Sequence, residues 1–241
     1  MSANSISKYF KTLMGAMRVC CLFSGGKDSV YALHKMLQSG FDVPVLLTIR
    51  SEDRDSWLYH TPGLEVADLF KDLTGIETEI VISPPDRERE QEVLAEALKD
   101  LKVRYGLDAI CSGALLSDFQ RMKFTHAAMD AGLISYTPLW RKDGLRYMQD
   151  LKEFGFIYML VSYASPGFDV SDLGKPVDDE MYHRFMINAK KWGSHPAFEG
   201  GEAETLILEA PCFEMGLKVK GHVEESGEFA ARFIIEEARV Q

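Results

Sequence analysis

The segment Ser24–Ser29, Ser-Gly-Gly-Lys-Asp-Ser, brings together residue types that bind phosphate. It follows an apolar run that ends at Phe23, and apolar residues recur beyond it at helical spacing. This pattern predicts a buried strand, a turn and a helix. The turn then lies at a helix N-terminus, where backbone N–H groups face an anion and where Gly25 and Gly26 let phosphate oxygens approach the backbone.

The side chains of this segment add to that chemistry. Ser24 and Ser29 supply hydroxyl donors, Lys27 a mobile positive charge, and Asp28 a carboxylate able to hold Mg²⁺ or to orient the amides. We predict a phosphate-binding loop with Lys27 and Asp28 as catalytic candidates and Asp28 as the metal ligand. The plain alternative is a turn that happens to be rich in Gly and Ser. The Gly-Lys-Ser/Thr ending of a Walker loop and the dinucleotide pattern Gly-x-Gly-x-x-Gly are both missing here.

A second candidate segment leaves an apolar run and turns at Gly113. Ser117 or Asp118 then stands where a helix N-cap belongs. The segment is either a capped helix and no more, or a functional loop in which Gln120 and Arg121 contact a nucleotide or its phosphates. Because the carboxyl ends of parallel strands share one edge of a sheet, the functional alternative places it beside the phosphate loop.

Two further segments carry groups that suit a binding site. Trp57–Pro62 follows the second expected strand, and His60 there is a candidate contact for adenine, although a lone His is more often structural. Glu199–Thr205 alternates three carboxylates with small residues, for which a solvated loop is the plain alternative. If that segment is extended, Glu202 and Glu204 lie on the same face.

The elements that would position these groups alternate between strands and helices as far as Trp140. Such alternation predicts a parallel, doubly wound α/β sheet with a ligand crevice at the carboxyl ends of the strands. Beyond it, helical and short β-like segments predict a smaller α+β domain. We therefore expect an N-terminal extension over 1–16, a nucleotide-binding domain over 17–140 and a substrate-binding domain over 141–241.

Composition narrows the classes of function. The chain has 241 residues, 46% of them apolar, and a formal net charge of −10, which argues against a long nucleic-acid track but leaves room for a local basic patch. No C-x-x-C occurs, so neither a zinc site nor a disulfide framework is expected. No run of apolar residues is long enough to span a bilayer and no signal-peptide pattern occurs, so we expect a cytoplasmic protein without a membrane partner. The four cysteines are Cys20, Cys21, Cys111 and Cys212, of which the first three are expected to be buried.

The motifs together carry a family resemblance. Ser24–Ser29 resembles the pyrophosphate loop of the N-type ATP pyrophosphatases, which cleave ATP between the α and β phosphates. With the segments 112–121, 137–140 and 199–205 in the same order, the chain from Met17 on resembles the diphthine-ammonia ligase family. The Glu-Gly-Gly-Glu-x-Glu-Thr segment narrows the superfamily to this family. The chain departs from archaeal relatives, which commonly have Gly at Phe198 and an aromatic residue at Ala203.

The resemblance implies an adenine nucleotide alpha hydrolase-like fold in the N-terminal domain. It also implies ATP-dependent amidation of diphthine, a modified histidine on translation elongation factor 2, with ammonium as the nitrogen donor and AMP and pyrophosphate as products. ATP and Mg²⁺ are the expected cofactors, and a homodimer is one assembly left open. The alternatives are a tRNA-modifying member of the superfamily, or a non-catalytic adenine-nucleotide-binding module.

The segments described above supply the candidate site residues, and the resemblance gives each group its expected ligand. The expected nucleotide contacts are Ser24, Gly25, Gly26, Lys27, Asp28, Ser29, His60, Gly113, Gln120 and Arg121. The expected substrate contacts are Glu199, Gly200, Gly201, Glu202, Glu204 and Thr205. Diphthine carries a trimethylammonium group, which carboxylates or aromatic faces recognise, so we expect at least one of these glutamates to face that cation.

Overall fold

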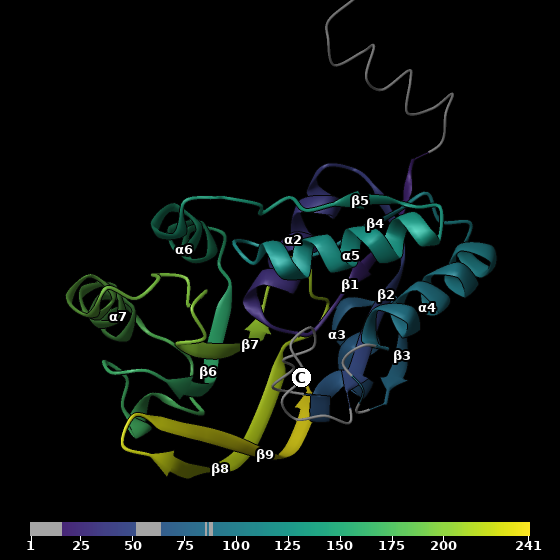
Figure 1. Cartoon of the computed structure of the whole chain (residues 1–241). Coiled ribbons are helices and arrows are strands. Elements are labelled where there is room, and N and C mark those ends of the chain that lie inside the picture. The colour runs from purple at the N-terminus through teal and green to yellow at the C-terminus, as the bar shows by residue number, and fades with distance from the viewer. Residues whose placement is uncertain (1–15, 52–63, 85, 87–88) are drawn as a thin grey trace, which may run out of the picture.

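The computed structural model describes residues 16–51, 64–84, 86 and 89–241. Residues 1–15 of the extension and the predicted contact His60 lie outside this part. The described residues form two sheets (Figure 1), a five-stranded parallel sheet in the order β3-β2-β1-β4-β5 and a four-stranded antiparallel sheet in the order β7-β6-β9-β8. The predicted fold class, a parallel doubly wound domain with a smaller α+β domain, is confirmed.

The first sheet carries helices on both faces. Successive residues of a strand point to opposite faces, so Cys20 packs with α4 and α5, whereas Cys21 packs with α2 and α3. Because the strand order reverses between β1 and β4, a crevice is expected where these two strands end. The elements of this part are β1 (Arg18–Leu22), α2 (Lys27–Gln38), β2 (Asp42–Ser51), η1 (Leu64–Leu69), α3 (Phe70–Thr74), β3 (Glu77–Ser83), α4 (Glu90–Tyr105), β4 (Ala109–Cys111), α5 (Asp118–Asp130) and β5 (Ile134–Tyr136).

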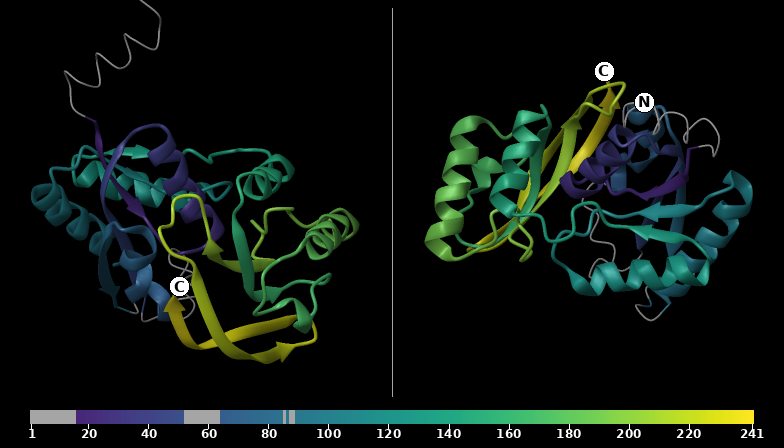
Figure 2. Two further views of the ribbon diagram at one scale, coloured as in Figure 1. Left: turned by 180° about the vertical axis from the view of Figure 1, so that it is seen from behind. Right: turned by 90° about the horizontal axis from the view of Figure 1, so that it is seen from above.

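The second sheet is covered on one face by α6 and α7 (Figure 2). The predicted boundary at residue 140 falls between β5 and α6 and stays a prediction. The sequence predicted short β-like segments in this part, but β8 and β9 have 11 residues each and pair as a hairpin. The elements of this part are α6 (Gly144–Glu153), β6 (Ile157–Ala164), η2 (Val170–Asp172), α7 (Asp179–Trp192), β7 (Ala203–Glu209), β8 (Leu217–Gly227) and β9 (Ala230–Val240).

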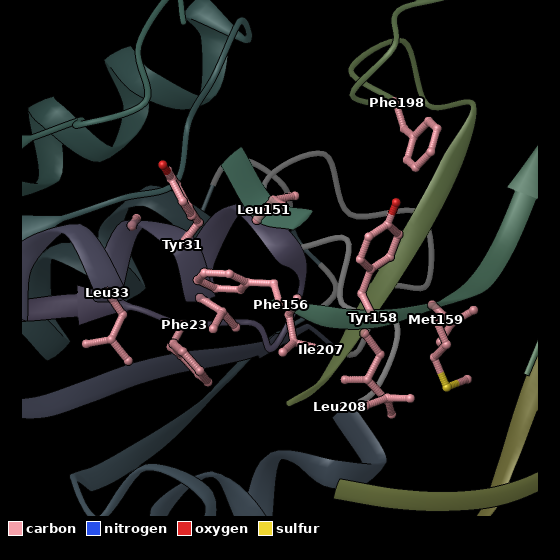
Figure 3. Packing of buried hydrophobic residues seen from close by; sticks show 14 of the residues in the cluster. Phe23, Tyr31, Leu33, Leu151, Phe156, Tyr158, Met159, Phe198, Ile207 and Leu208 are labelled. Carbon is pink, nitrogen blue, oxygen red and sulfur yellow. The ribbon is translucent and has the colours of Figure 1, made fainter. Parts of the chain in front are cut away.

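The two sheets share one hydrophobic core. Phe23 and Leu33 from the first part belong to the same buried cluster as Tyr158 and Ile207 from the second (Figure 3). The backbone N–H of Ile207 also donates to the carbonyl of Gly25 at 2.9 Å. Strand β7 is therefore fixed directly against the segment predicted to bind phosphate.

The burial of three cysteines is also as predicted. Cys20, Cys21 and Cys111 are at most 1% exposed. Burial raises the pKa of the Cys20 thiol far above its usual value, which keeps this thiol neutral. Among the described helices, none is long and apolar enough to cross a membrane.

Candidate functional site

The segment Ser24–Ser29 forms the predicted turn into a helix. Gly26 is the N-cap of α2, which begins at Lys27. Gly25 has a φ of +76°, and a Cβ atom there would lie 2.9 Å from the Phe70 ring, so the position requires Gly. The Ser29 hydroxyl donates to the carbonyl of Gly26 at 3.0 Å and accepts from the Ser24 hydroxyl at 3.1 Å. The loop is thus held by its own serines.

Strand β7 supplies the cap of this helix. Thr205 Oγ1 accepts a hydrogen bond of 3.1 Å from the backbone N–H of Lys27, while Gly26 itself gives no side-chain cap. Thr205 is 5% exposed. Its hydroxyl therefore satisfies one of the N–H groups that a helix leaves without a partner at its start. Thr205 therefore caps α2, and its predicted contact with the substrate stays a prediction.

Lys27 is not the mobile charge that the sequence suggested. Its side chain is 4% exposed, and Nζ lies 2.8 Å from Asp28 Oδ2 and 5.6 Å from the centroid of the Phe198 ring. The other oxygen, Asp28 Oδ1, accepts a hydrogen bond of 2.9 Å from the Tyr147 hydroxyl. Burial and the Asp28 charge raise the pKa of Tyr147, so its hydroxyl stays protonated. The ion pair and the covering aromatic ring explain why Lys27 is fixed.

A cavity of about 190 Å³ opens where β1 and β4 end. Gly113 lines it, and a Cβ atom there would lie 2.6 Å from the backbone carbon of Asp28. The segment after β4 therefore packs tightly onto the first turn of α2, and Gly at this position makes the close approach feasible. The polar lining residues are Ser24, Asp28, Ser29, Ser112, Gln120 and Glu199.

The two predicted contacts on α5 differ in position. Ser117 is the N-cap of this helix and accepts from the backbone N–H of Gln120 at 3.3 Å. Gln120 lines the cavity, but Arg121 does not. Arg121 is paired with Asp118 at 2.7 Å and stacks over the Trp140 ring at 4.6 Å. The structure thus brings Gln120 to the cavity, and a phosphate contact for Arg121 stays a prediction.

Glu199 comes from the second part of the chain and lines the same cavity as the phosphate loop. Its Oε2 accepts a hydrogen bond of 3.1 Å from the backbone N–H of Leu116. Burial, and then the negative charge of Asp28, raise the pKa of Glu199 from 4.5 to about 7, against an opposing effect of Lys27. This carboxyl group can therefore gain or lose a proton near neutral pH.

The other two carboxylates of the acidic segment have different surroundings. Glu202 is 8% exposed and accepts bonds of 2.7 Å from the backbone N–H groups of His195 and Gly200, so it closes its own loop. Glu204 lies within strand β7 and accepts a bond of 3.0 Å from the Ser162 hydroxyl. Glu204 lines a separate cavity to which Glu202 does not contribute. The two glutamates therefore do not face one shared cavity among the described ones.

Comparison with known proteins identifies the family. The model of the diphthamide synthase N-terminal domain matches residues 17–135, and that of the diphthamide synthase C-terminal domain matches residues 143–239. The chain belongs to the diphthamide synthase family. The segment 136–142 lies between these two matches; it begins with the last residue of β5 and ends shortly before α6.

Curated members of the diphthamide synthase family match most of this chain. A Bos taurus diphthine–ammonia ligase is 30% identical over 82% of the chain and 81% of its own length, and the Homo sapiens protein of that name is 29% identical over the same shares. The Schizosaccharomyces pombe relative is 29% identical over 82% of the chain, which spans 35% of that relative's length. A solved U34-tRNA thiolase, NcsA from Methanococcus maripaludis, aligns with 81% of this chain and 75% of its own length, at 14% identity and a TM-score of 0.36.

The sequence analysis did not predict a role for two side chains beside the phosphate loop, those of Tyr147 and Phe198. Tyr147 lies in α6 and reads as one more apolar residue of an amphipathic helix, so nothing in the sequence indicates its bond to Asp28. Phe198 adopts a φ of +64°, and its ring packs edge-on against those of Phe168 and Phe185. A positive φ favours Gly, which is consistent with the Gly that archaeal relatives commonly have at this position.

Proposed function

We propose that this chain is an ATP-dependent ligase that amidates diphthine on translation elongation factor 2 with ammonium, releasing AMP and pyrophosphate. The observation that carries the proposal is the shared cavity. The phosphate loop lines it from the first sheet, and Glu199 of the acidic segment lines it from the other part of the chain. One cavity can thus hold a nucleotide against groups that receive a second substrate.

The phosphate loop suits the binding of ATP. The N-terminus of α2 directs N–H groups and the positive end of the helix dipole toward an anion. Lys27 lies at this point with its ammonium 2.8 Å from Asp28, so a positive charge is held in place at the start of the helix. Such preorganised charge stabilises the negative charge that develops when pyrophosphate leaves.

The Asp28 carboxylate fits Mg²⁺. Mg²⁺ in nucleotide sites is held by one or two carboxylates together with the phosphates and water, and Asp28 lines the cavity. Bound Mg²⁺ neutralises charge on the phosphates. The requirement for Mg²⁺, like the predicted roles of the loop residues, is part of the proposal.

The reaction has two steps. The diphthine carboxylate attacks the α phosphorus of ATP, the bond to the pyrophosphate oxygen breaks, and an acyl-adenylate forms. Ammonia then attacks the acyl carbon, and AMP leaves. Ammonium loses two protons in becoming the amide. Glu199 lines the cavity and has a pKa of about 7, so its carboxylate can accept one of these protons.

The remaining assignments rest on the same proposal. The acceptor is elongation factor 2 carrying diphthine, the expected location is the cytoplasm, and a homodimer is an assembly to be tested by sedimentation. Glu204, Glu224 and Glu225 line the second cavity, and carboxylates suit the positive charge of the trimethylammonium group of diphthine.

The decisive experiment incubates the protein with diphthine-bearing elongation factor 2, ATP, Mg²⁺ and ammonium. Conversion of the carboxylate into an amide lowers the mass of the factor by about one dalton, and AMP appears in equal amount. AMP release that needs no acceptor, or no AMP release at all, would contradict the proposal. Tight and strongly salt-dependent binding of bulk tRNA would instead favour a tRNA-modifying enzyme.

A further inference from the structure

One buried hydroxyl in the cavity has no assigned role. Ser112 follows β4 directly and is 1% exposed. Its backbone N–H donates to the carbonyl of Tyr136 at 3.0 Å, but its side-chain oxygen has no hydrogen-bond partner among the described residues. A buried hydroxyl without a partner costs free energy, so its presence needs an explanation.

The position of Ser112 supplies that explanation. It lines the cavity beside the phosphate loop, and the next residue, Gly113, touches the first turn of α2. His34 Nε2 and Tyr158 Oη are also buried without a partner in the described part, but neither residue lines a described cavity. Ser112 therefore combines a hydroxyl of unmet hydrogen-bonding capacity with a place in the wall of the cavity.

The cavity wall indicates which part of a nucleotide lies there. The loop Ser24–Ser29 supplies the groups that suit phosphates, whereas the remaining wall is largely apolar and suits a base and a ribose. The larger apolar side chains of this wall are Leu22, Phe23, Leu47, Ile49, Leu115 and Phe124. A single hydroxyl in such a wall can fix the orientation of the nucleoside.

We propose that the Ser112 hydroxyl forms a hydrogen bond to the nucleoside half of the bound nucleotide and positions it for attack at the α phosphorus. The proposal rests on the proposed function for the identity of the ligand. It adds a specificity-determining residue on β4 to the site formed by the phosphate loop. In the nucleotide-free protein this hydroxyl has no hydrogen-bond partner among the described residues, so its removal should not lower the stability of that form.

The test replaces Ser112 with Ala and measures binding of ATP, AMP and pyrophosphate by calorimetry. We expect ATP and AMP to bind about tenfold more weakly, which is the typical effect of one lost hydrogen bond, while pyrophosphate affinity stays unchanged. The unfolding midpoint of the empty variant should equal or exceed that of the wild type. Ser112→Cys, which nearly keeps the volume but donates weakly, should fall between Ala and wild type in ATP affinity.

A matched control comes from a second buried hydroxyl beside the same loop. Thr48 is fully buried, and its Oγ1 donates to the carbonyl of Phe23 at 2.8 Å. Because this hydroxyl is already satisfied, Thr48→Val should lower the unfolding midpoint, in contrast to Ser112→Ala.

The outcomes separate this inference from the proposed function. Equal nucleotide affinity in the wild type and Ser112→Ala, or an equal loss for pyrophosphate, would overturn the role of Ser112 alone. A destabilised empty Ser112→Ala protein with normal nucleotide affinity would make the hydroxyl structural and would also overturn it. A wild-type protein that binds no adenine nucleotide would overturn both.

Discussion

The phosphate loop and the acidic segment both pack several polar residues into a short stretch, but the fold uses them in different ways. In Ser24–Ser29 the polar groups gather at the start of one helix and hold one another. In Glu199–Thr205 each polar side chain has its own surroundings, from the shared cavity to the second cavity and the cap of α2. Residues close in sequence act together where one helix end orients them, and separately where contacts with distant segments orient them.

The largest expected effect is a loss of turnover when the phosphate loop Ser24–Ser29 is changed. Lys27→Met keeps the buried aliphatic stem and removes the charge beside the phosphates. We expect turnover to fall by about 10² to 10³, as is typical when one preorganised donor is removed, and the mass assay on elongation factor 2 measures it. Lys35→Met is the matched control, because Lys35 lies on the same helix and bonds the exposed Gln38. A folded Lys27→Met protein with wild-type turnover would show that the ion pair with Asp28 serves only the fold.

The sequence could predict the features of the site that depend on neighbouring residues, but not those that depend on residues distant in the chain. The helix N-terminus at Gly26, the cap at Ser117 and the cavity edge beside Gly113 follow from local pattern and from the geometry of parallel strands. The fixed position of Lys27 depends on Phe198, which is distant in sequence. A single sequence carries no signal of such a contact.

The next largest effect concerns the shared cavity. The pKa of Glu199 is raised from 4.5 to about 7 in the folded protein. The folded state therefore binds more protons than the unfolded state between these values, so stability falls as pH rises through that window. Glu199→Gln removes this dependence. The difference in free energy of unfolding between the variant and the wild type should therefore shift in favour of the variant by up to about 3 kcal/mol when the pH is raised from 4.5 to 8.

Urea unfolding of both proteins without nucleotide, from pH 4.5 to pH 8, measures this difference. The amide of Gln keeps an oxygen to accept from Leu116, so the loop contact is preserved. A stability difference between the two proteins that does not vary with pH would place the Glu199 carboxyl group in water rather than beside Asp28.

A third prediction compares two glutamates two residues apart. Both carboxylate oxygens of Glu202 accept backbone N–H bonds, so Glu202→Gln turns one acceptor into a donor that faces another donor. We expect a loss of about 1–3 kcal/mol in the free energy of unfolding. Glu204→Gln keeps an acceptor for the Ser162 hydroxyl, so we expect a smaller loss of stability and, if the second cavity receives the acceptor protein, a larger loss of amidation.

Unfolding and amidation measured on both variants decide between the roles. Equal loss of stability in the two would mean that the acidic segment acts as one structural unit. The sequence could predict neither role, because alternation along a strand indicates which residues share a face but not which distant N–H or hydroxyl groups they meet. His195 and Ser162 are those partners here.

The smallest expected effect lies where the two regions touch. Thr205 belongs to the acidic segment by sequence, but its Oγ1 caps the helix of the phosphate loop through the N–H of Lys27. Thr205→Val keeps the shape and removes the acceptor, so we expect the free energy of unfolding to fall by about 1 kcal/mol, the usual loss for an N-cap. Thr205→Ser keeps the hydroxyl and should retain most of the stability. Unchanged stability of Thr205→Val together with lost amidation would instead make Thr205 a substrate contact, as the sequence alone suggested, and the acidic segment would then act on the acceptor from β7 as well as from its loop.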